Sequence, residues 1–134
     1  MKVDGSCHCG YITYSAEVDS DAALICHCTD CQTLSGSAYR TVLPTPDKDF
    51  QLHSGKLKTY VKTAQSGRRR AQTFCPECGS PIYAAPVDDG PKTLNLRIGT
   101  IRQRAELIPK LQVWHRSALP WAQDIHDLPA RETQ

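Results

Sequence analysis

Seven cysteines in three short clusters constrain this chain more than any other feature of its sequence. The clusters contain every cysteine: the N-terminal pair, Cys7 and Cys9; the trio, Cys26, Cys28 and Cys31; and the knuckle pair, Cys75 and Cys78. Four thiolates make a closed tetrahedral zinc site, whereas three thiolates leave one coordination position open. The cysteine count therefore predicts two zinc ions per chain, one structural and one reactive, with no thiol left over.

The spacing within the two pairs fits ligation of a single ion. In Cys7-His8-Cys9, residues i and i+2 of an extended chain face the same side, so both thiols can reach one metal. In Cys75-Pro76-Glu77-Cys78-Gly79, the proline presets a turn and the glycine permits backbone angles that other residues avoid. Such a tight turn lets amide N–H groups point toward the sulfur atoms. Both pairs are therefore predicted to be metal ligands.

The clusters can be combined in two ways, and both remain open from spacing alone. The first joins the N-terminal pair with the knuckle pair and leaves the trio as a separate site. The second joins Cys28 and Cys31 with the knuckle pair, as in a zinc ribbon. That second arrangement leaves Cys26 and the N-terminal pair with too few ligands. We favour the first arrangement because it uses every thiol.

The trio has the ligand pattern of catalytic zinc sites, whose open position takes water or an incoming thiol. Zinc deprotonates a thiol that coordinates it, and the product is a nucleophilic thiolate at neutral pH. In a purely structural site, His8, His27 or an acidic side chain would close this position. Each of the two histidines lies between two cysteines, so on an extended chain it points away from the metal. We expect both to be supporting or surface groups.

The bulk properties narrow the setting in which these thiols act. A length of 134 residues suits one domain spanning residues 1–134. No run of 18 apolar residues predicts a membrane span, and no apolar stretch follows the N-terminus as in a secretory signal. We expect a cytoplasmic protein, where closely spaced cysteines favour metals over disulfides. The formal charge of +2 becomes about −1 with seven thiolates and two zinc ions, which gives no argument for nucleic acid.

The hydrophobic periodicity predicts a mainly β fold with little helix and about seven to ten short strands. Predicted strands cover residues 12–18, 38–43, 57–63, 82–85, 94–98 and 111–115, and residues 68–74 must be extended to deliver Cys75 to a metal. Turns are predicted at residues 44–47, 53–56, 66–67 and 88–91. One turn of helix is expected around Asp30–Leu34. A second short helix is expected after Pro120, because Trp121, Ile125 and Leu128 recur at helical spacing.

Motifs across nearly the whole chain resemble those of one known family. They are Gly5–Gly10 (GSCHCG), Cys26–Cys31 (CHCTDC), Ser35–Ser37, Phe74–Ser80 (FCPECGS), Ile98–Thr100 and Leu119–Trp121. In order and spacing the chain resembles the glutathione-dependent formaldehyde-activating enzyme family, also called the centromere-protein-V/GFA domain family. All seven cysteines fall where this family has its metal ligands.

The resemblance implies a β-tent fold, in which small twisted antiparallel sheets surround two zinc sites. It implies a structural zinc on Cys7, Cys9, Cys75 and Cys78, and a catalytic zinc on the trio. It further implies a carbon–sulfur lyase that condenses glutathione with formaldehyde to S-(hydroxymethyl)glutathione. The expected partner is thus a small-molecule thiol, glutathione, with no nucleic acid and no membrane. The sequence carries no signal for oligomeric state.

Five residues outside the cysteines are candidates for substrate binding. Gln32, Ser35 and Ser37 follow the trio directly; His115 is a candidate general acid. Arg70 ends the basic triplet Arg68–Arg70, which is either a solvated strand or turn or a cradle for a substrate carboxylate. The two tryptophans near the C-terminus we expect to pack in the core or in a lid.

The resemblance has one departure, and the site has competing interpretations. Arg102-Gln103-Arg104 stands where relatives often carry acidic residues, which indicates a more anionic ligand. A non-enzymatic, zinc-stabilised binding module is the main alternative to an enzyme. A fourth protein ligand at the trio would favour that module, whereas an exchangeable water or thiol would favour catalysis. Redox sensing by a zinc-free trio is a third interpretation.

Overall fold

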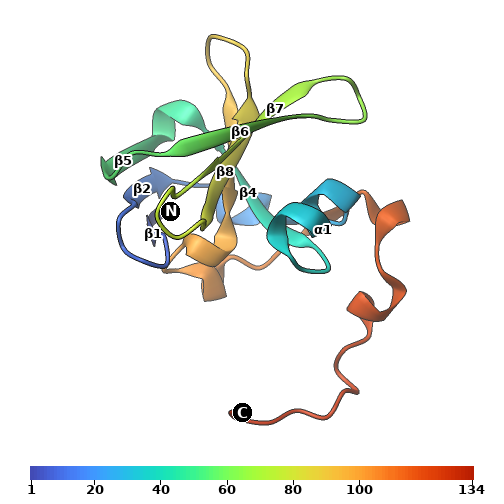
Figure 1. The fold of residues 1–134 in the computed structure, drawn as a ribbon. Helices are drawn as coiled ribbons and strands as arrows, with labels where there is room; N and C mark the ends of the chain where they lie inside the picture. Colours follow the sequence, from blue (N-terminus) through green and yellow to red (C-terminus); the bar gives the residue numbers. More distant parts are fainter.

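The computed structural model describes residues 1–134 and shows a mainly β protein with one α-helix (Figure 1). The strands are β1 (Lys2–Ser6), β2 (Thr13–Glu17), β3 (Leu24–Cys26), β4 (Arg40–Pro46), β5 (Phe50–Ser54), β6 (Lys58–Thr63), β7 (Arg69–Phe74), β8 (Pro81–Pro86), β9 (Thr93–Arg97) and β10 (Leu111–Val113). The α-helix is α1 (Thr29–Ser35). The 3-10 turns are η1 (Ser20–Ala22), η2 (Asp47–Asp49), η3 (Ile98–Thr100), η4 (Arg104–Glu106), η5 (His115–Ser117) and η6 (Pro120–Gln123). The mainly β prediction is confirmed.

The strands form two sheets of unequal size. A three-stranded sheet has the order β1-β2-β5, and a seven-stranded sheet has the order β10-β3-β4-β9-β8-β7-β6. Every pairing is antiparallel except that of β10 with β3, where Val113 lies beside Cys26 in parallel register. The expectation of wholly antiparallel sheets is wrong at this one pair. A parallel neighbour requires a long crossover, and here the chain returns to β3 from far along the sequence.

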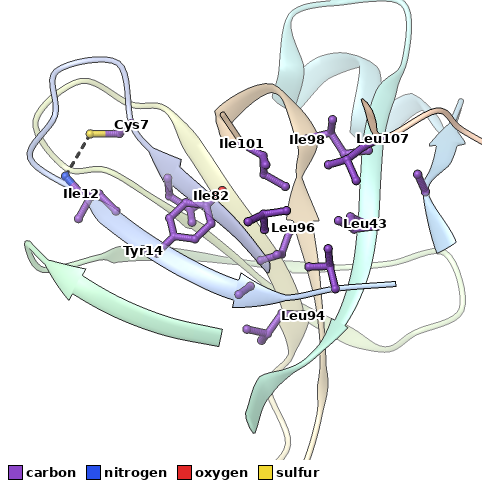
Figure 2. Packing of buried hydrophobic residues seen from close by; sticks show 14 of the residues in the cluster. Cys7, Ile12, Tyr14, Leu43, Ile82, Leu94, Leu96, Ile98, Ile101 and Leu107 are labelled. Atoms are coloured by element: carbon purple, nitrogen blue, oxygen red, sulfur yellow. Dashed lines mark hydrogen bonds between the residues drawn. The ribbon is translucent and has the colours of Figure 1, made fainter. Parts of the chain in front are cut away.

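The hydrophobic core lies where the small sheet packs against the large one. Figure 2 shows Tyr14 of β2 facing Ile82, Leu96 and Ile101, all of them fully buried. The Tyr14 hydroxyl shares a hydrogen bond of 2.7 Å with the Thr100 hydroxyl, so the ring is buried without losing its polar partner. Side chains of this size each contribute about 1.5–3 kcal/mol on burial. This contact area holds the two sheets together.

The two faces of the seven-stranded sheet have different roles, because successive side chains of a strand point to opposite sides. One face carries Leu43 and Leu94 into the core shared with the small sheet. On the other face, cross-strand register aligns polar and small residues. That row contains Cys26, Arg40, Val42, Asn95, Arg97, Ala84, Arg70, Gln72 and Lys62. Helix α1 packs beside β4 near this face, which is therefore not simply open to water.

The turn predicted at residues 44–47 is largely wrong, because β4 continues through Pro44 to Pro46. Proline removes a backbone donor and is normally excluded from central strands. Strand β3 pairs β4 only from Arg40 to Val42, so one edge of β4 is free beyond that point. The prolines occupy this locally unpaired stretch while β9 pairs the other edge. The sequence pattern could not show how short β3 is.

The helix predicted after Pro120 is also wrong. Only the 3-10 turn η6 forms there, and the chain then runs away from the body as an arm, drawn red in Figure 1. Trp121, Ile125 and Leu128 are exposed, so nothing holds them on one helical face. An isolated helix this short is not stable in water without packing. Trp114 is likewise partly exposed, so neither tryptophan lies in the core, which was one of the two positions expected for them. None of the helices has the length and apolar character that crossing a bilayer requires.

Candidate metal centres

The N-terminal pair and the knuckle pair meet to form what we call the four-cysteine centre. Their four sulfur atoms all lie within 4.8 Å of one another. The sulfurs of Cys7 and Cys9 are 3.6 Å apart, and those of Cys9 and Cys75 are 3.9 Å apart. A tetrahedral zinc with Zn–S bonds near 2.3 Å requires sulfur separations of about 3.8 Å. The donor set and its spacing therefore fit a zinc ion.

Local backbone geometry explains why these thiols converge. The chain folds back after β1, and the Ile12 amide donates to the Cys7 sulfur at 3.2 Å (Figure 2). In the knuckle, the Gly79 amide donates to the Cys75 carbonyl at 2.9 Å, with Gly79 at a positive φ of 77°. A side chain would be strained at that angle. The glycine after the second cysteine thus has the role that its sequence position predicted.

The four-cysteine centre is apolar on one side and exposed to solvent on the other. Cys7 and Cys75 are buried in the hydrophobic core, whereas Cys9 and Cys78 lie at the surface. Burial would raise the pKa of Cys7, but the Ile12 amide and the neighbouring thiols outweigh it and lower that pKa. The Ser80 hydroxyl and backbone amides lower the pKa of Cys78 to about 5. Both effects favour the thiolate form that binds metal.

The trio forms the second group of sulfurs, again within 4.8 Å of one another. Cys26 ends β3, and Cys28 caps α1, where its sulfur accepts the Cys31 amide at 3.2 Å. One strand end and one helical turn thus present all three thiols to a single point. No histidine or carboxylate joins this group. The trio could therefore hold a metal ion with one position left for another ligand.

Because the three sulfur atoms pack closely, the pKa values of the three thiols differ from one another. The Cys26 and Cys31 thiols donate hydrogen bonds to Cys28 and hold its pKa far below the usual range. Hydrogen bonds to Cys26 and then to Cys28 raise the pKa of Cys31, and the pKa of Cys26 is raised chiefly by its hydrogen bond with Cys28. Three thiolates cannot coexist at this spacing without a cation between them. A divalent metal would supply that cation.

The trio opens onto a cavity of about 320 Å³, which we call the trio cavity. Its floor is the polar row of the seven-stranded sheet, and Leu34 of α1 and Trp114 after β10 complete its walls. Trp114 has a left-handed backbone with φ of 54°, which is uncommon for a residue other than glycine. The size falls at the low end of pockets that bind small molecules.

The charge of the trio cavity is strongly positive. Four cationic side chains line it: Lys62, Arg40, Arg70 and Arg97. The one acidic lining residue, Asp30, is bound by the Lys62 ammonium at 2.6 Å. Arg40 and Arg97 are buried, with 6% and 8% of their surfaces exposed. Desolvation and the neighbouring Arg40 lower the pKa of Arg97 to about 9, which leaves it charged at neutral pH.

The substrate-binding candidates from the sequence are placed at different distances from this cavity. Arg70 lines it, whereas Gln32, Ser35, Ser37 and His115 do not. Instead, the Gln32 amide donates to the carbonyls of His27 and Ser117, at 2.9 and 3.0 Å, and so ties α1 to the chain after β10. The Ser35 hydroxyl donates to the Gln32 carbonyl within the helix. Ser37 follows the turn that ends α1.

The two histidines that separate cysteines have unlike environments. His8 is exposed, and its amide donates to the Ser80 hydroxyl at 3.0 Å. His27 is buried, and its Nε2 lies 2.7 Å from Gln112 Oε1. The His115 ring packs edge-on against the His27 ring with centroids 5.7 Å apart, and Gln123 contacts His115 at 2.6 Å. Neither His8 nor His27 joins a sulfur group, in keeping with the supporting or surface positions expected.

Sequence reasoning missed Arg40, Gln72 and Arg97 at this site. The alternation of Leu94, Leu96 and Ile98 with Asn95 and Arg97 predicts a strand with one dry face, but it does not show what covers the other face. The second face is in fact the cavity floor. Arg40 begins β4 beside Cys26, and Arg97 ends β9 beside Val42. Only this cross-strand register, which the sequence does not give, shows that the two arginines share a face.

The fold and the two sulfur groups define a small β protein with one four-thiol and one three-thiol centre that could each hold a metal. The family model described as glutathione-dependent formaldehyde-activating enzyme (GFA) matches residues 2–117, and the chain belongs to this family. The crystal structure of a Rhodobacter sphaeroides protein, a structural-genomics target, resembles it with a TM-score of 0.63 at 19% identity. That alignment covers 84% of this chain and 99% of the other. No curated protein matches the sequence significantly.

Proposed function

We propose that this protein is a zinc-dependent enzyme, of the carbon–sulfur lyase type, that acts on an adduct between a thiol and a carbonyl compound. Glutathione is the proposed thiol and formaldehyde the proposed carbonyl compound, in line with the family description. The observation that carries the proposal is the trio. Its three thiols face a cationic cavity and have no fourth protein ligand. A purely structural site would be expected to close on a fourth side chain.

Zinc is the proposed cofactor of both centres, two ions per chain. Cys7, Cys9, Cys75 and Cys78 would hold the structural ion, and Cys26, Cys28 and Cys31 the catalytic one. Thiolate ligands at these spacings select zinc over hard cations such as magnesium. When bound at the trio, zinc supplies a Lewis-acidic position that lowers the pKa of an incoming thiol.

The chain's own residues would attract and position the reactants. Arg40, Arg70 and Arg97 create a positive potential that favours an anionic thiolate over the neutral thiol. In the condensation, the sulfur forms a bond to the carbonyl carbon, and the π electrons move to the oxygen. That oxygen then takes the proton that the thiol released. The same cations stabilise the negative charge on oxygen before it is protonated. The reverse reaction breaks the carbon–sulfur bond.

Gln32 and His115 fit a positioning role better than direct contact. Gln32 holds the His27 carbonyl, one residue from two of the trio cysteines. His115 packs on the His27 ring behind the trio. Arg70 remains the candidate for contact with substrate, since it lines the cavity. Ser35 and Ser37 would act indirectly, by stabilising the C-terminal end of α1.

A reducing compartment, the cytoplasm, would keep all seven thiols available for metal binding. We also propose that residues 1–134 act as one domain.

The test is the zinc content of freshly purified protein, with and without excess glutathione. We expect two zinc ions per chain, and zinc-edge X-ray absorption should show an added sulfur ligand when glutathione binds. A Cys31→Ser variant should stay folded, keep one zinc and lose this response. One tightly held zinc, indifferent to glutathione in the wild-type protein, would contradict the proposal.

A non-enzymatic binding module is the second candidate. It is favoured by one observation: the C-terminal arm leaves Trp121, Ile125 and Leu128 exposed, as in segments that pack on a partner. The zinc experiment separates the two candidates. Closure of the trio by a ligand that glutathione cannot displace would support the module and not the enzyme.

A further inference from the structure

The seven-stranded sheet places Arg40 and Arg97 near each other, and both donate a hydrogen bond to the same uncharged oxygen atom. They lie on neighbouring strands β4 and β9, on the same face as Cys26. Gln72 Oε1 accepts from Arg97 Nη2 at 3.0 Å and from Arg40 Nη1 at 3.4 Å. We call these three residues the arginine pair and its bridge. A side-chain amide is a weak partner for two charged groups at once.

No carboxylate neutralises the arginine pair. Neither guanidinium forms an ion pair, although both residues are more than nine-tenths buried. The Nε of Arg97 is buried and has no hydrogen-bond partner. Removing such charges from water is costly unless an opposite charge accompanies them. Buried guanidinium groups with unused donors, facing a cavity, indicate an anionic ligand.

The net charge of the groups around the trio remains positive when zinc is bound, so it still favours binding of an anion. Three thiolates and one divalent zinc carry a single net negative charge, whereas Arg40, Arg70 and Arg97 carry three positive charges. Lys62 and Asp30 cancel each other. An incoming thiolate and one carboxylate together bring the cavity to neutrality. A dianionic phosphate would overshoot this balance, so a carboxylate fits better.

The arginine pair also lies at the junction of two cavities. Arg40, Gln72 and Arg97 line both the trio cavity and a neighbouring cavity of about 210 Å³. The second cavity is walled by aromatic side chains, Tyr60, Phe74 and Tyr83. A carboxylate bound by the arginine pair would hold the middle of a ligand at the junction of the two cavities. The sulfur end of that ligand would then point toward the trio.

We propose that Arg40 and Arg97, bridged by Gln72, form a carboxylate-binding site that holds the substrate while its sulfur occupies the open position of the trio. This rests on the proposed function, because it assumes that sulfur binds at the trio. The carboxylate has two sources: the thiol itself, as in a mercapto acid, or the carbonyl partner, as in a 2-oxo acid. The recognition chemistry is the same for both.

The test compares small thiols with and without a carboxylate. Isothermal titration calorimetry on zinc-loaded protein would measure 3-mercaptopropionate against 2-mercaptoethanol, each alone and with glyoxylate or formaldehyde. We expect 3-mercaptopropionate to bind at least about tenfold more tightly, as for a hydrogen bond to a charged group. That result assigns the carboxylate to the thiol. If instead glyoxylate, but not formaldehyde, tightens 2-mercaptoethanol, the carboxylate belongs to the carbonyl partner.

Gln72→Glu is the decisive variant. It places a carboxylate of nearly the same shape between the two arginines, so it should raise Tm and reduce the preference for 3-mercaptopropionate to about threefold or less. Gln51→Glu adds the same charge on the exposed strand β5 and should keep the preference. Arg97→Gln should also lose the preference. If that variant fails to fold, Gln72→Glu gives the same information from a folded protein.

Two outcomes would overturn the inference, and they are distinguishable. If the wild-type protein binds both thiols equally, with either carbonyl compound, the carboxylate site is wrong while the thiol-binding function stands. An unchanged preference in Gln72→Glu has the same meaning. If neither thiol binds zinc-loaded protein at all, the proposed function fails, and this inference fails with it.

Discussion

The four-cysteine centre and the trio use the same ligand atom in opposite surroundings. In the first, Cys7 and Cys75 belong to the hydrophobic core, the Ile12 amide donates to the Cys7 sulfur, and the Ser80 hydroxyl contacts the Cys78 sulfur. In the second, three half-buried thiols lie on the other face of the seven-stranded sheet, beside buried guanidinium groups. Sulfur chemistry alone would not separate the two. The two centres are distinguished by the number of ligands and by the charge and solvent exposure of their surroundings.

This contrast predicts different consequences of damage at each centre. Apolar packing around a closed centre makes metal binding part of folding. Cationic groups around an open centre stabilise exchangeable anions, including an incoming thiolate. Loss of a ligand should therefore cost stability at the four-cysteine centre and ligand binding at the trio.

The largest effect is expected for Cys75→Ser. Structural zinc contributes about 10–16 kcal/mol in small zinc domains, which is comparable to or larger than the roughly 5–15 kcal/mol stability of a typical domain. Because Cys75 is fully buried, we expect this variant to lose its native fold, measured by far-UV circular dichroism and zinc content. Cys31→Ser is the matched control and should stay folded. The reverse pattern, a stable Cys75→Ser and an unfolded Cys31→Ser, would break the comparison.

Gly5→Ala tests the packing that supports the four-cysteine centre without touching a ligand. A Cβ at Gly5 would collide with the Tyr14 ring, which lies against β1. Such overpacking costs about 1–3 kcal/mol or more, so a lower Tm and weaker retention of the structural zinc are expected. Gly99→Ala is the control, since a Cβ there meets nothing within 4 Å. Equal effects of the two substitutions would show that the ring is free to move.

Alkaline pH should act on the same core, where the Tyr14 phenol is buried. Burial raises the pKa of Tyr14 to about 12 from its ordinary value of 10.0. A raised pKa favours the protonated phenol in the folded protein, so its stabilising contribution is complete below pH 10 and is lost between pH 10 and 12. The loss is at most about 2.7 kcal/mol.

Comparison with Tyr14→Phe isolates this contribution, because all other titrating groups are shared. Urea unfolding at pH 8 and pH 11.5 should show a steeper loss for wild-type protein. At pH 8 the variant should be less stable by about 1 kcal/mol, since it lacks the hydrogen bond to Thr100. Parallel losses in both proteins would mean that Tyr14 is not the buried phenol responsible.

The smallest effect is expected for Asp30→Asn, on the trio side. Asp30 is 47% exposed, so its ion pair with Lys62 is screened, and its loss should cost less than about 1 kcal/mol. Ligand binding should respond in the opposite direction, because Lys62 becomes an unpaired cation beside the cavity. A few-fold tighter binding of 3-mercaptopropionate by calorimetry is expected. Glu132→Gln, in the exposed arm, should change neither quantity.

The sequence was most informative where structure is local. Metal ligands two or three residues apart converge by backbone geometry alone, so the clusters could be recognised without knowing the fold. Alternating patterns likewise located β2 and β9, and a Thr/Tyr/Val-rich composition located β6. The turn of helix expected around Asp30–Leu34 is confirmed as α1, which Cys28 caps and Gly36 ends.

The parts of the structure that the sequence did not predict depend on which elements cover each surface of a strand or helix. Alternation in β9 shows that Asn95 and Arg97 share a face, but not that Leu34 of α1 and Trp114 wall the cavity over that face. Strands β1, β3 and β5 escaped prediction because β1 contains Asp4 and Gly5, β3 has three residues, and β5 is largely exposed. The C-terminal pattern failed for the opposite reason. Helical spacing at Trp121, Ile125 and Leu128 has no partner surface to stabilise it.

The separation of ligands along the chain has a consequence for the order in which the metals load. The trio spans six consecutive residues, so an unfolded chain can close around a metal there at little entropic cost. The four-cysteine centre must wait until the start of the chain meets the knuckle between β7 and β8. Loading order and tightness of retention are thus opposed. If both centres bind zinc as proposed, a newly made chain would fill the trio first, and the four-cysteine centre would fill only as the sheets assemble.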